Sequence, residues 1–142
     1  VEKAGTVILS VNPSVEIDYD ANGLVMDISG LNEDGLNLAA QEEDLIGTPC
    51  LVALHKLIVD IHDAGFFVSD FGGRGRDIFL YLQKGSIYHE GFLKALEQSI
   101  AEAADGCGLT TSHLITVNAN EDNTTLQNDL EFGHLYLGKL NK

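Results

Sequence analysis

Asn12, Pro13 and Ser14 stand in a stretch that otherwise alternates apolar and polar residues as a β-strand does, SVNPSVEI. Proline has no N–H to give to a strand ladder, so the Asn-Pro pair interrupts the strand at a chemically distinctive bond. An asparagine usually cyclises through the next backbone nitrogen, and Asn22-Gly23 is the place for that reaction in this chain. The nitrogen of Pro13 carries no proton, so this route is closed at Asn12.

The reverse cyclisation remains open to Asn12. Its side-chain nitrogen would add to its own main-chain carbonyl, expel Pro13 as a secondary amine and leave a succinimide, which cuts the backbone. An amide nitrogen is a poor nucleophile, so the fold would have to hold Asn12 ready for attack, twist the tertiary amide and aim donors at the developing oxyanion. Ser14 is the candidate for protonating the leaving nitrogen or donating to the oxyanion, and Ser10 is a less favoured one.

The catalytic set that this chemistry predicts is therefore Asn12, Pro13 and Ser14. A structural interpretation stays open beside it. Asn-Pro is a common turn dipeptide, in which the asparagine side chain caps a backbone group and the proline fixes φ.

Three strands are expected around this dipeptide, over residues 5–11, 15–19 and 24–29, because apolar and polar residues alternate in each. Residues 20–23 end in Asn-Gly, which tolerates positive φ, and supply a hairpin turn between the second and third strands. The three strands form a meander that is interrupted once, at Pro13.

Two main helices are expected further along the chain. Thr48 as the N-cap and Pro49 at the first helical position begin one helix, which Gly65 closes. The second helix runs from Ser86 to Gly106. The other expected elements are a polar turn, a short helical stretch, a loop with a glycine-rich tip, a buried strand and a last core strand, over residues 30–35, 38–41, 66–77, 78–82 and 114–117. This order predicts an α+β domain, with one sheet and helices packed on a face of it.

The composition suits one globular domain of 142 residues, of which 44% are hydrophobic, and the formal net charge is −14. So acidic a surface repels phosphate backbones and anionic headgroups, so binding to nucleic acid or to a membrane surface is not expected. No apolar run reaches the roughly 18 residues of a transmembrane helix, and no signal peptide is expected at the start. Because the chain begins at Val1 and leads at once into a strand, we expect it to be a piece of a longer protein.

Other groups of residues resemble chemical sites, but their spacing indicates structural roles. Cys50 and Cys107 lack CxxC spacing and are expected to be buried free thiols. His55 and His62 share a helix face but lack further zinc ligands, and the His-Glu pair at His89 lacks the second histidine of HExxH. The glycine-rich tip at residues 72–76 precedes a strand, whereas a phosphate-binding loop precedes a helix. No cofactor, no metal ion and no intermolecular enzyme activity are therefore expected.

Three segments together resemble the extracytoplasmic middle domain of RsgI-type anti-sigma factors: SVNPSVEI, the turn GLNEDG after a strand, and DLIGTP before an amphipathic helix. The resemblance covers residues 5–117. Its most specific parts are Asn12, Pro13 and Ser14 with Glu16, and the Asn-Glu-Asp-Gly turn.

The resemblance implies a single-pass membrane protein whose cytoplasmic segment sequesters a sigma factor and whose middle domain lies just outside the membrane. It further implies self-cleavage between Asn12 and Pro13. We then expect one domain over residues 1–142, made of an N-terminal strand stub (1–12), a core (13–118) and a C-terminal extension (119–142). The stub stays paired with the core until the outer piece is pulled away. Intramembrane proteolysis then releases the sigma factor.

The expected partners follow from this scheme. The first is the chain's own N-terminal strand fragment after cleavage. A sigma factor and an intramembrane protease, and extracellular carbohydrate, would be engaged only through regions outside this chain.

A second hypothesis places the chain in the same family but without self-cleavage. The domain would then be a non-catalytic sensor module that binds a ligand or partner through its acidic surface or through an aromatic segment, Phe66, Phe67 and Phe71, with Asn-Pro as a turn. An unrelated soluble enzyme is a third hypothesis, for which no constellation of residues is found.

Overall fold

The computed structural model describes residues 2–67, 76–121, 125–129 and 136–137. The strands are β1 (Lys3–Ser10), β2 (Ser14–Asp20), β3 (Val25–Gly30), β4 (Ile78–Leu82), β5 (His113–Asn118), β6 (Thr125–Asp129) and β7 (Tyr136–Leu137). The helices are α1 (Glu33–Gln41), the 3-10 turn η1 (Glu43–Leu45), α2 (Cys50–Asp63) and α3 (Phe92–Gly106).

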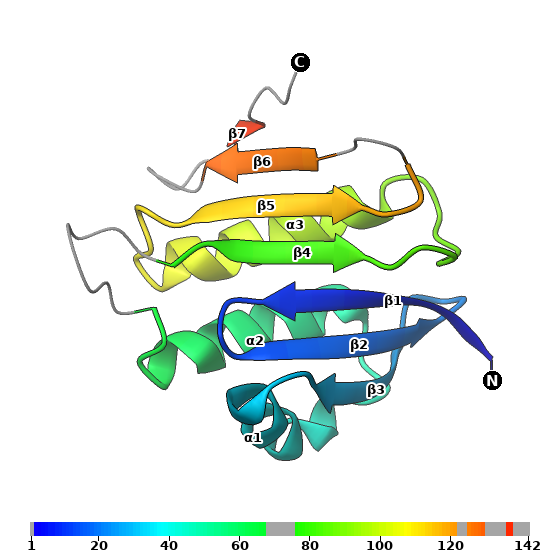
Figure 1. Ribbon diagram of the computed structural model, residues 1–142, viewed down its shortest axis with the longest axis horizontal. Coiled ribbons are helices and arrows are strands. Elements are labelled where there is room, and N and C mark those ends of the chain that lie inside the picture. The colour runs from blue at the N-terminus through cyan, green and yellow to red at the C-terminus, as the bar shows by residue number, and fades with distance from the viewer. Residues whose placement is uncertain (1, 68–75, 122–124, 130–135, 138–142) are drawn as a thin grey trace.

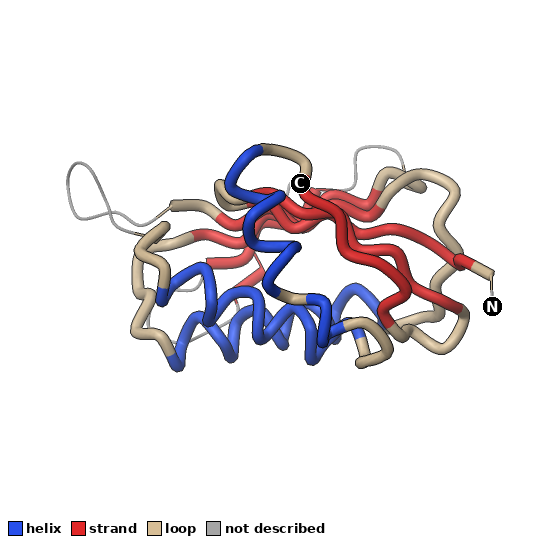
Figure 2. Tube along the Cα trace, turned by 90° about the horizontal axis from the view of Figure 1, so that it is seen from below, coloured by secondary structure: helices blue, strands red, loops and turns tan. Residues whose placement is uncertain are grey.

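The strands form one mixed sheet in the order β3-β2-β1-β4-β5-β6-β7, in which β4 and β5 run parallel and the other neighbours antiparallel. Helices α2 and α3 lie side by side on one face of the sheet, and α1 lies beside β3 (Figures 1 and 2). The prediction of an α+β domain with one sheet and helices on a face is confirmed.

The core lies between the sheet and the pair α2 and α3. Alternate residues of the strands point into it because successive side chains of a strand face opposite sides. The fully buried large side chains come from both layers: Leu9, Ile17, Ile78, Leu80, Leu82 and Leu114 from the strands, and Leu54, Leu57, Ile58, Ile61, Leu96 and Ile100 from the helices. On the helices these positions recur three or four residues apart, which is the spacing of an amphipathic helix.

The three-strand meander is also confirmed. β1 pairs with β2, with Ser10 opposite Ser14, and β2 pairs with β3. In the turn before β3, Asp20 Oδ1 accepts hydrogen bonds from the backbone N–H groups of Asn22 and Leu24, at 2.9 and 3.0 Å. Gly23 has a φ of 79°, a conformation that an Asn-Gly turn accommodates.

The second main helix begins later than the sequence predicts, at Phe92 instead of Ser86. Residues 86–87 bind β1 instead. The Ser86 hydroxyl oxygen accepts a hydrogen bond from the backbone N–H of Thr6 at 3.0 Å, and the N–H of Ile87 donates to the Ala4 carbonyl at 2.8 Å. Gly91, with a φ of 88°, then directs the chain into α3.

Two other boundaries differ from the prediction. The N-cap of α2 is Pro49, not Thr48, whose hydroxyl donates to the Leu45 carbonyl at 2.7 Å. Of the polar turn expected over residues 30–35, the last three residues form the first turn of α1, which begins at Glu33 and is capped by Asn32. The sheet also continues through β6 and β7, past the strand that was expected to be the last. The glycine-rich tip lies almost wholly outside the described residues.

A buried carboxyl group joins α2 to the segment between α1 and η1. Glu42 is 2% exposed, and Lys56 Nζ lies 3.1 Å from its Oε1 and 2.8 Å from Asp60 Oδ2. Burial raises the pKa of Glu42 from 4.5 to about 7, a hydrogen bond with Asp60 raises it further, and Lys56 opposes the shift. The folded chain therefore holds a proton at Glu42 that the unfolded chain has already released at pH 6.

We expect the free energy of unfolding to fall as the pH rises through this window. The contribution of Glu42 is fully present below pH 4.5 and is lost as the pH rises through about 7, because the folded pKa is the higher one. Glu42→Gln should flatten this part of the profile, measured by urea unfolding at pH 5, 6, 7 and 8. Glu43→Gln, at an exposed neighbour, is the control and should leave the slope unchanged. An unchanged slope in Glu42→Gln would contradict the assignment.

Candidate functional site

The connection between β1 and β2 is a loop of three residues, Val11, Asn12 and Pro13. The flanking Ser10 and Ser14 are paired across the ladder, and the Val11 N–H donates to the Pro13 carbonyl at 3.0 Å. Pro13 is buried, whereas Asn12 is exposed. The interruption that the sequence predicts is therefore a tight hairpin loop at one end of the sheet.

Asn12 has an unusual backbone conformation. Its φ is 104°, and among the described residues it is the one residue other than glycine with a positive φ. Such a conformation costs an L-residue roughly 1–3 kcal/mol and persists only where the surroundings impose it. Here Pro13, whose ring fixes its own φ, and the ladder that ends at Ser10 and Ser14 impose it.

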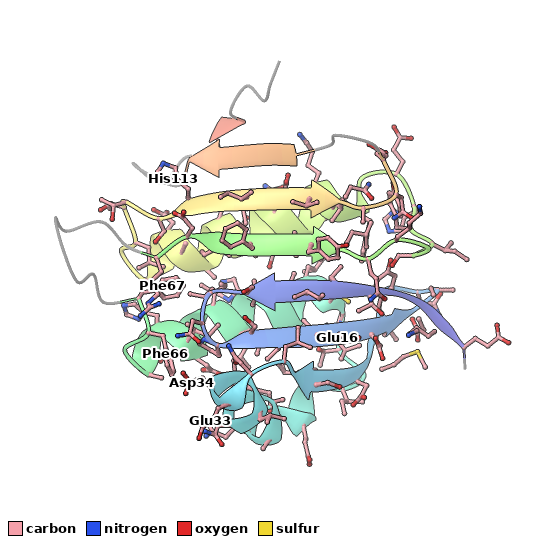
Figure 3. The ribbon with its side chains drawn as sticks, viewed as in Figure 1. Glu16, Glu33, Asp34, Phe66, Phe67 and His113 are labelled. Carbon is pink, nitrogen blue, oxygen red and sulfur yellow. The ribbon has the colours of Figure 1, made fainter. Side chains whose placement is uncertain are left out.

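Asn32 ties this loop to the start of α1. Its Nδ2 donates to Asn12 Oδ1 at 3.2 Å, and its Oδ1 accepts from the backbone N–H groups of Ser14 at 3.2 Å and Gly35 at 2.7 Å. One carboxamide thus caps a helix, holds the first residue of β2 and holds the side chain of Asn12. Glu33 and Asp34, in the first turn of α1, place negative charge at the helix N-terminus, where the helix dipole favours it (Figure 3).

The backbone of α1 packs directly on the strand end. The Leu31 N–H donates to the Ser14 carbonyl at 2.9 Å, and a methyl group on Gly35 would overlap that same carbonyl oxygen. Glycine at position 35 therefore permits the close approach that puts Asn32 within reach of Asn12.

The two serines that flank the loop form a hydroxyl pair. Ser10 Oγ and Ser14 Oγ lie 2.6 Å apart, and either hydroxyl can be the donor. One hydroxyl proton is used between them and the other remains available, so the pair can accept a proton at one oxygen and deliver one from the other.

The structure thus brings three of the expected groups together. Asn12 and Ser14 are linked through Asn32, and Ser10 joins Ser14. Asn32 was not among the predicted site residues, because the sequence pattern places it in a polar turn. The available signal was an asparagine followed directly by two acidic residues at the start of a helical stretch, which is an N-cap pattern.

Other expectations for sites have mixed outcomes. Phe67 is 6% exposed and belongs to the core, and Phe66 is half-buried against it, so these two rings do not form an exposed aromatic surface (Figure 3). Phe71 lies outside the described residues.

Cys50 is buried and free, as predicted, whereas Cys107 is free but only half-buried. Within the described residues, no three or more His, Cys, Asp or Glu side chains are grouped as metal ligands.

The structure thus defines a small α+β domain in which the first strand lies inside the sheet and a strained Asn-Pro loop lies beside a helix N-cap. A family model described as the anti-sigma factor RsgI-like central domain matches residues 4–139. The chain belongs to this family and acts in anti-sigma factor signalling, as the resemblance predicted. No curated protein matches the chain.

The family points to an association with the membrane. In the part of the chain that the structure describes, no helix has both the length and the apolar character needed to cross a bilayer.

We expect Gly35→Ala to destabilise the fold by about 1–3 kcal/mol, because the added methyl group forces α1 away from the Ser14 carbonyl. The measurement is the free energy of unfolding in urea. Gly106→Ala is the matched control, since a methyl group there meets open space in a helix, and it should be neutral or stabilise by up to about 1 kcal/mol. Equal effects of the two substitutions would show that the contact at Gly35 is unimportant.

Proposed function

We propose that this chain is the extracytoplasmic signalling domain of an anti-sigma factor, and that it cuts itself between Asn12 and Pro13. The two pieces stay associated through the sheet until the outer piece is pulled away. The observation that carries the proposal is the positive φ of Asn12 together with the hydrogen bond from Asn32 to its side chain. Within the described residues, the Asn12 side chain accepts from Asn32 and caps no backbone N–H, which argues against a simple capping role.

The proposed reaction is an intramolecular transamidation that cuts the chain in two. A bond forms between Asn12 Nδ2 and the Asn12 carbonyl carbon, and the bond from that carbon to the Pro13 nitrogen breaks. The proton lost by Nδ2 ends on the Pro13 nitrogen, which becomes a secondary amine, and Asn12 becomes a C-terminal succinimide. No water, metal or cofactor enters this step.

Three groups of this chain support the step. As Nδ2 loses its proton, negative charge gathers on Asn12 Oδ1, and the donor from Asn32 Nδ2 stabilises it there. The same hydrogen bond restricts the rotamers of Asn12 and so lowers the entropy cost of reaching the attack geometry. The hydroxyl pair of Ser10 and Ser14 serves as the proton carrier from Nδ2 to the leaving nitrogen.

After the cut, the strand β1 would remain in place. It lies between β2 and β4, and its residues Val7 and Leu9 are fully buried. Each such side chain contributes roughly 1.5–3 kcal/mol. The hydrogen bond from Thr6 Oγ1 to Asp18 Oδ1, at 2.7 Å, holds β1 to β2 in addition to the ladder.

This retention gives the domain its signalling role. The stub, residues 1–12, would be the part connected to the membrane side, and force on the rest of the protein would extract it. A sigma factor, an intramembrane protease and modules that bind extracellular carbohydrate would act through other regions of the full protein.

We expect the mass spectrum of the purified chain to show two fragments that meet after Asn12. Because the first step consumes no water, their masses should initially sum to that of the intact chain, and should gain one water as the succinimide hydrolyses. Asn12→Ala should remain whole, because the nucleophile is gone. Asn22→Ala, in the exposed turn, is the control and should be cut at the normal rate. A single stable species of 15.3 kDa after prolonged incubation would refute the cleavage.

We expect Asn32→Asp to slow the cleavage by roughly ten- to a hundredfold while leaving the fold intact. Aspartate retains the oxygen that caps α1 and accepts from Ser14, but it has no donor for Asn12 Oδ1. The cleavage rate and the urea midpoint are measured together. Asn37→Asp, at an exposed position of α1, makes the same change of charge and should alter neither. A normal rate in Asn32→Asp would exclude Asn32 as a positioning residue.

A further inference from the structure

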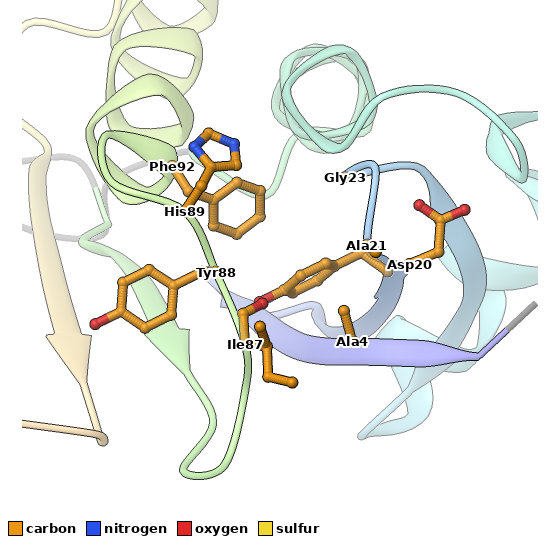
Figure 4. Close-up of a pocket in the computed structure, with 9 residues that line it drawn as sticks. Ala4, Asp20, Ala21, Gly23, Ile87, Tyr88, His89 and Phe92 are labelled. Atoms are coloured by element: carbon orange, nitrogen blue, oxygen red, sulfur yellow. The ribbon is translucent and has the colours of Figure 1, made fainter.

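A cavity of about 240 Å³ lies at the other end of β1, away from the Asn-Pro loop. It is formed where the start of β1, the turn after β2 and the segment that leads into α3 meet (Figure 4). Its lining residues are Ala4, Tyr19, Asp20, Ala21, Gly23, Ile87, Tyr88, His89 and Phe92. The volume admits a small molecule but not a folded segment.

The walls of this cavity are rich in aromatic rings that hold each other in place. The ring centroids of Tyr19 and Phe92 are 4.8 Å apart, and those of His89 and Phe92 are 5.6 Å apart. The Tyr19 hydroxyl donates to the Ile87 carbonyl at 3.0 Å, and burial raises its pKa to about 12, so the phenol is neutral at physiological pH. An aromatic ring attracts a cation placed over its face through its quadrupole, so a cavity lined with such rings suits a cation.

The negative charge at the cavity also favours a cation. Asp20 is one of the lining residues and is 9% exposed. Its Oδ1 accepts hydrogen bonds from two backbone N–H groups of the turn, which hold the carboxylate in place. The whole chain has a formal net charge of −14, which raises the local concentration of cations. An anionic ligand is therefore disfavoured here, and a neutral one gains nothing from the carboxylate.

We infer that this cavity binds a small organic ammonium ion, and that the bound ion strengthens the hold on the N-terminal strand; the second step rests on the proposed cleavage. Ala4 belongs to β1, whereas the other lining residues belong to the body of the domain. A ligand in the cavity contacts both pieces at once. It lies against Ile87, whose N–H binds the Ala4 carbonyl at 2.8 Å.

Binding is tested first on the Asn12→Ala chain, which keeps all the lining residues and needs no cleavage. Choline is the probe, and neohexyl alcohol, in which carbon replaces the charged nitrogen, is its uncharged isostere. Choline should bind about tenfold more tightly than the alcohol, measured by calorimetry and by NMR shifts of the lining residues. Equal affinity would overturn the assignment to a cation, and no binding of either would overturn the site.

Matched substitutions locate the binding. Ala21→Phe should fill the cavity and abolish choline binding, whereas Asn22→Phe places the same ring one residue away and should not. Asp20→Asn should weaken choline about tenfold and leave the alcohol unaffected, because the amide oxygen still accepts the turn N–H groups. Unfolding midpoints identify any variant that has lost its fold. Choline binding that survives Ala21→Phe in a folded chain would refute this location.

The effect on retention is tested on the cleaved wild-type chain. The rate at which a labelled N-terminal fragment leaves the rest is measured with choline and with neohexyl alcohol, and choline should slow it in proportion to its occupancy. If the fragment leaves at an unchanged rate at saturating choline, the effect of the ligand on retention is refuted, although the binding site is not. A chain that stays whole by mass spectrometry would refute the proposed cleavage, and binding to the Asn12→Ala chain would still decide the site.

Discussion

The pairing of β1 with both β2 and β4 is the constraint on which the rest of this structure depends. β1 joins the antiparallel strands β2 and β3 on one side to the parallel pair β4 and β5 on the other. Its buried residues Val7 and Leu9 lie beneath the helix layer. Without β1, two strand edges and an apolar trough would face water, so the fold requires this strand whether or not it is covalently continuous with β2.

The loop between β1 and β2 shows how that constraint produces strain. Antiparallel pairing up to Ser10 and Ser14 leaves three residues to reverse the chain, and one of them is a proline with a fixed φ. Asn12 therefore takes a φ of 104°, which a glycine would adopt at little cost. The contacts of Asn32 and Gly35 with Ser14 hold the strand end against α1, so the loop cannot relax by shifting the strand. Cutting after Asn12 would release the strain without loss of any ladder pair.

Local signals in the sequence were sufficient for the parts of the fold that depend on periodicity and backbone chemistry. The meander follows from the alternation that burial of one face imposes, and the interruption at Pro13 follows from its missing N–H. Contacts between distant residues were not predictable in this way. The start of α3 depends on Ser86 bonding to Thr6, 80 residues away, and the role of Asn32 depends on Asn12, 20 residues away. The pairing of β6 with β5 similarly depends on a partner strand and not on a pattern within the segment.

In the proposed function, the cut and the release would depend on different parts of β1. The positive φ of Asn12 and the Asn32 hydrogen bond lie at the end of the strand, whereas the buried side chains that would retain it, Val7 and Leu9, lie further along it. A force applied at the Lys3 end and directed along the strand would load the ladders to β2 and β4 together over residues 7–10, because these residues pair with both strands. Both buried side chains must then leave the core in one step. The proposed cleavage could therefore finish early without weakening the pairing of β1, and core substitutions that leave the reacting groups untouched would alter the force needed for release.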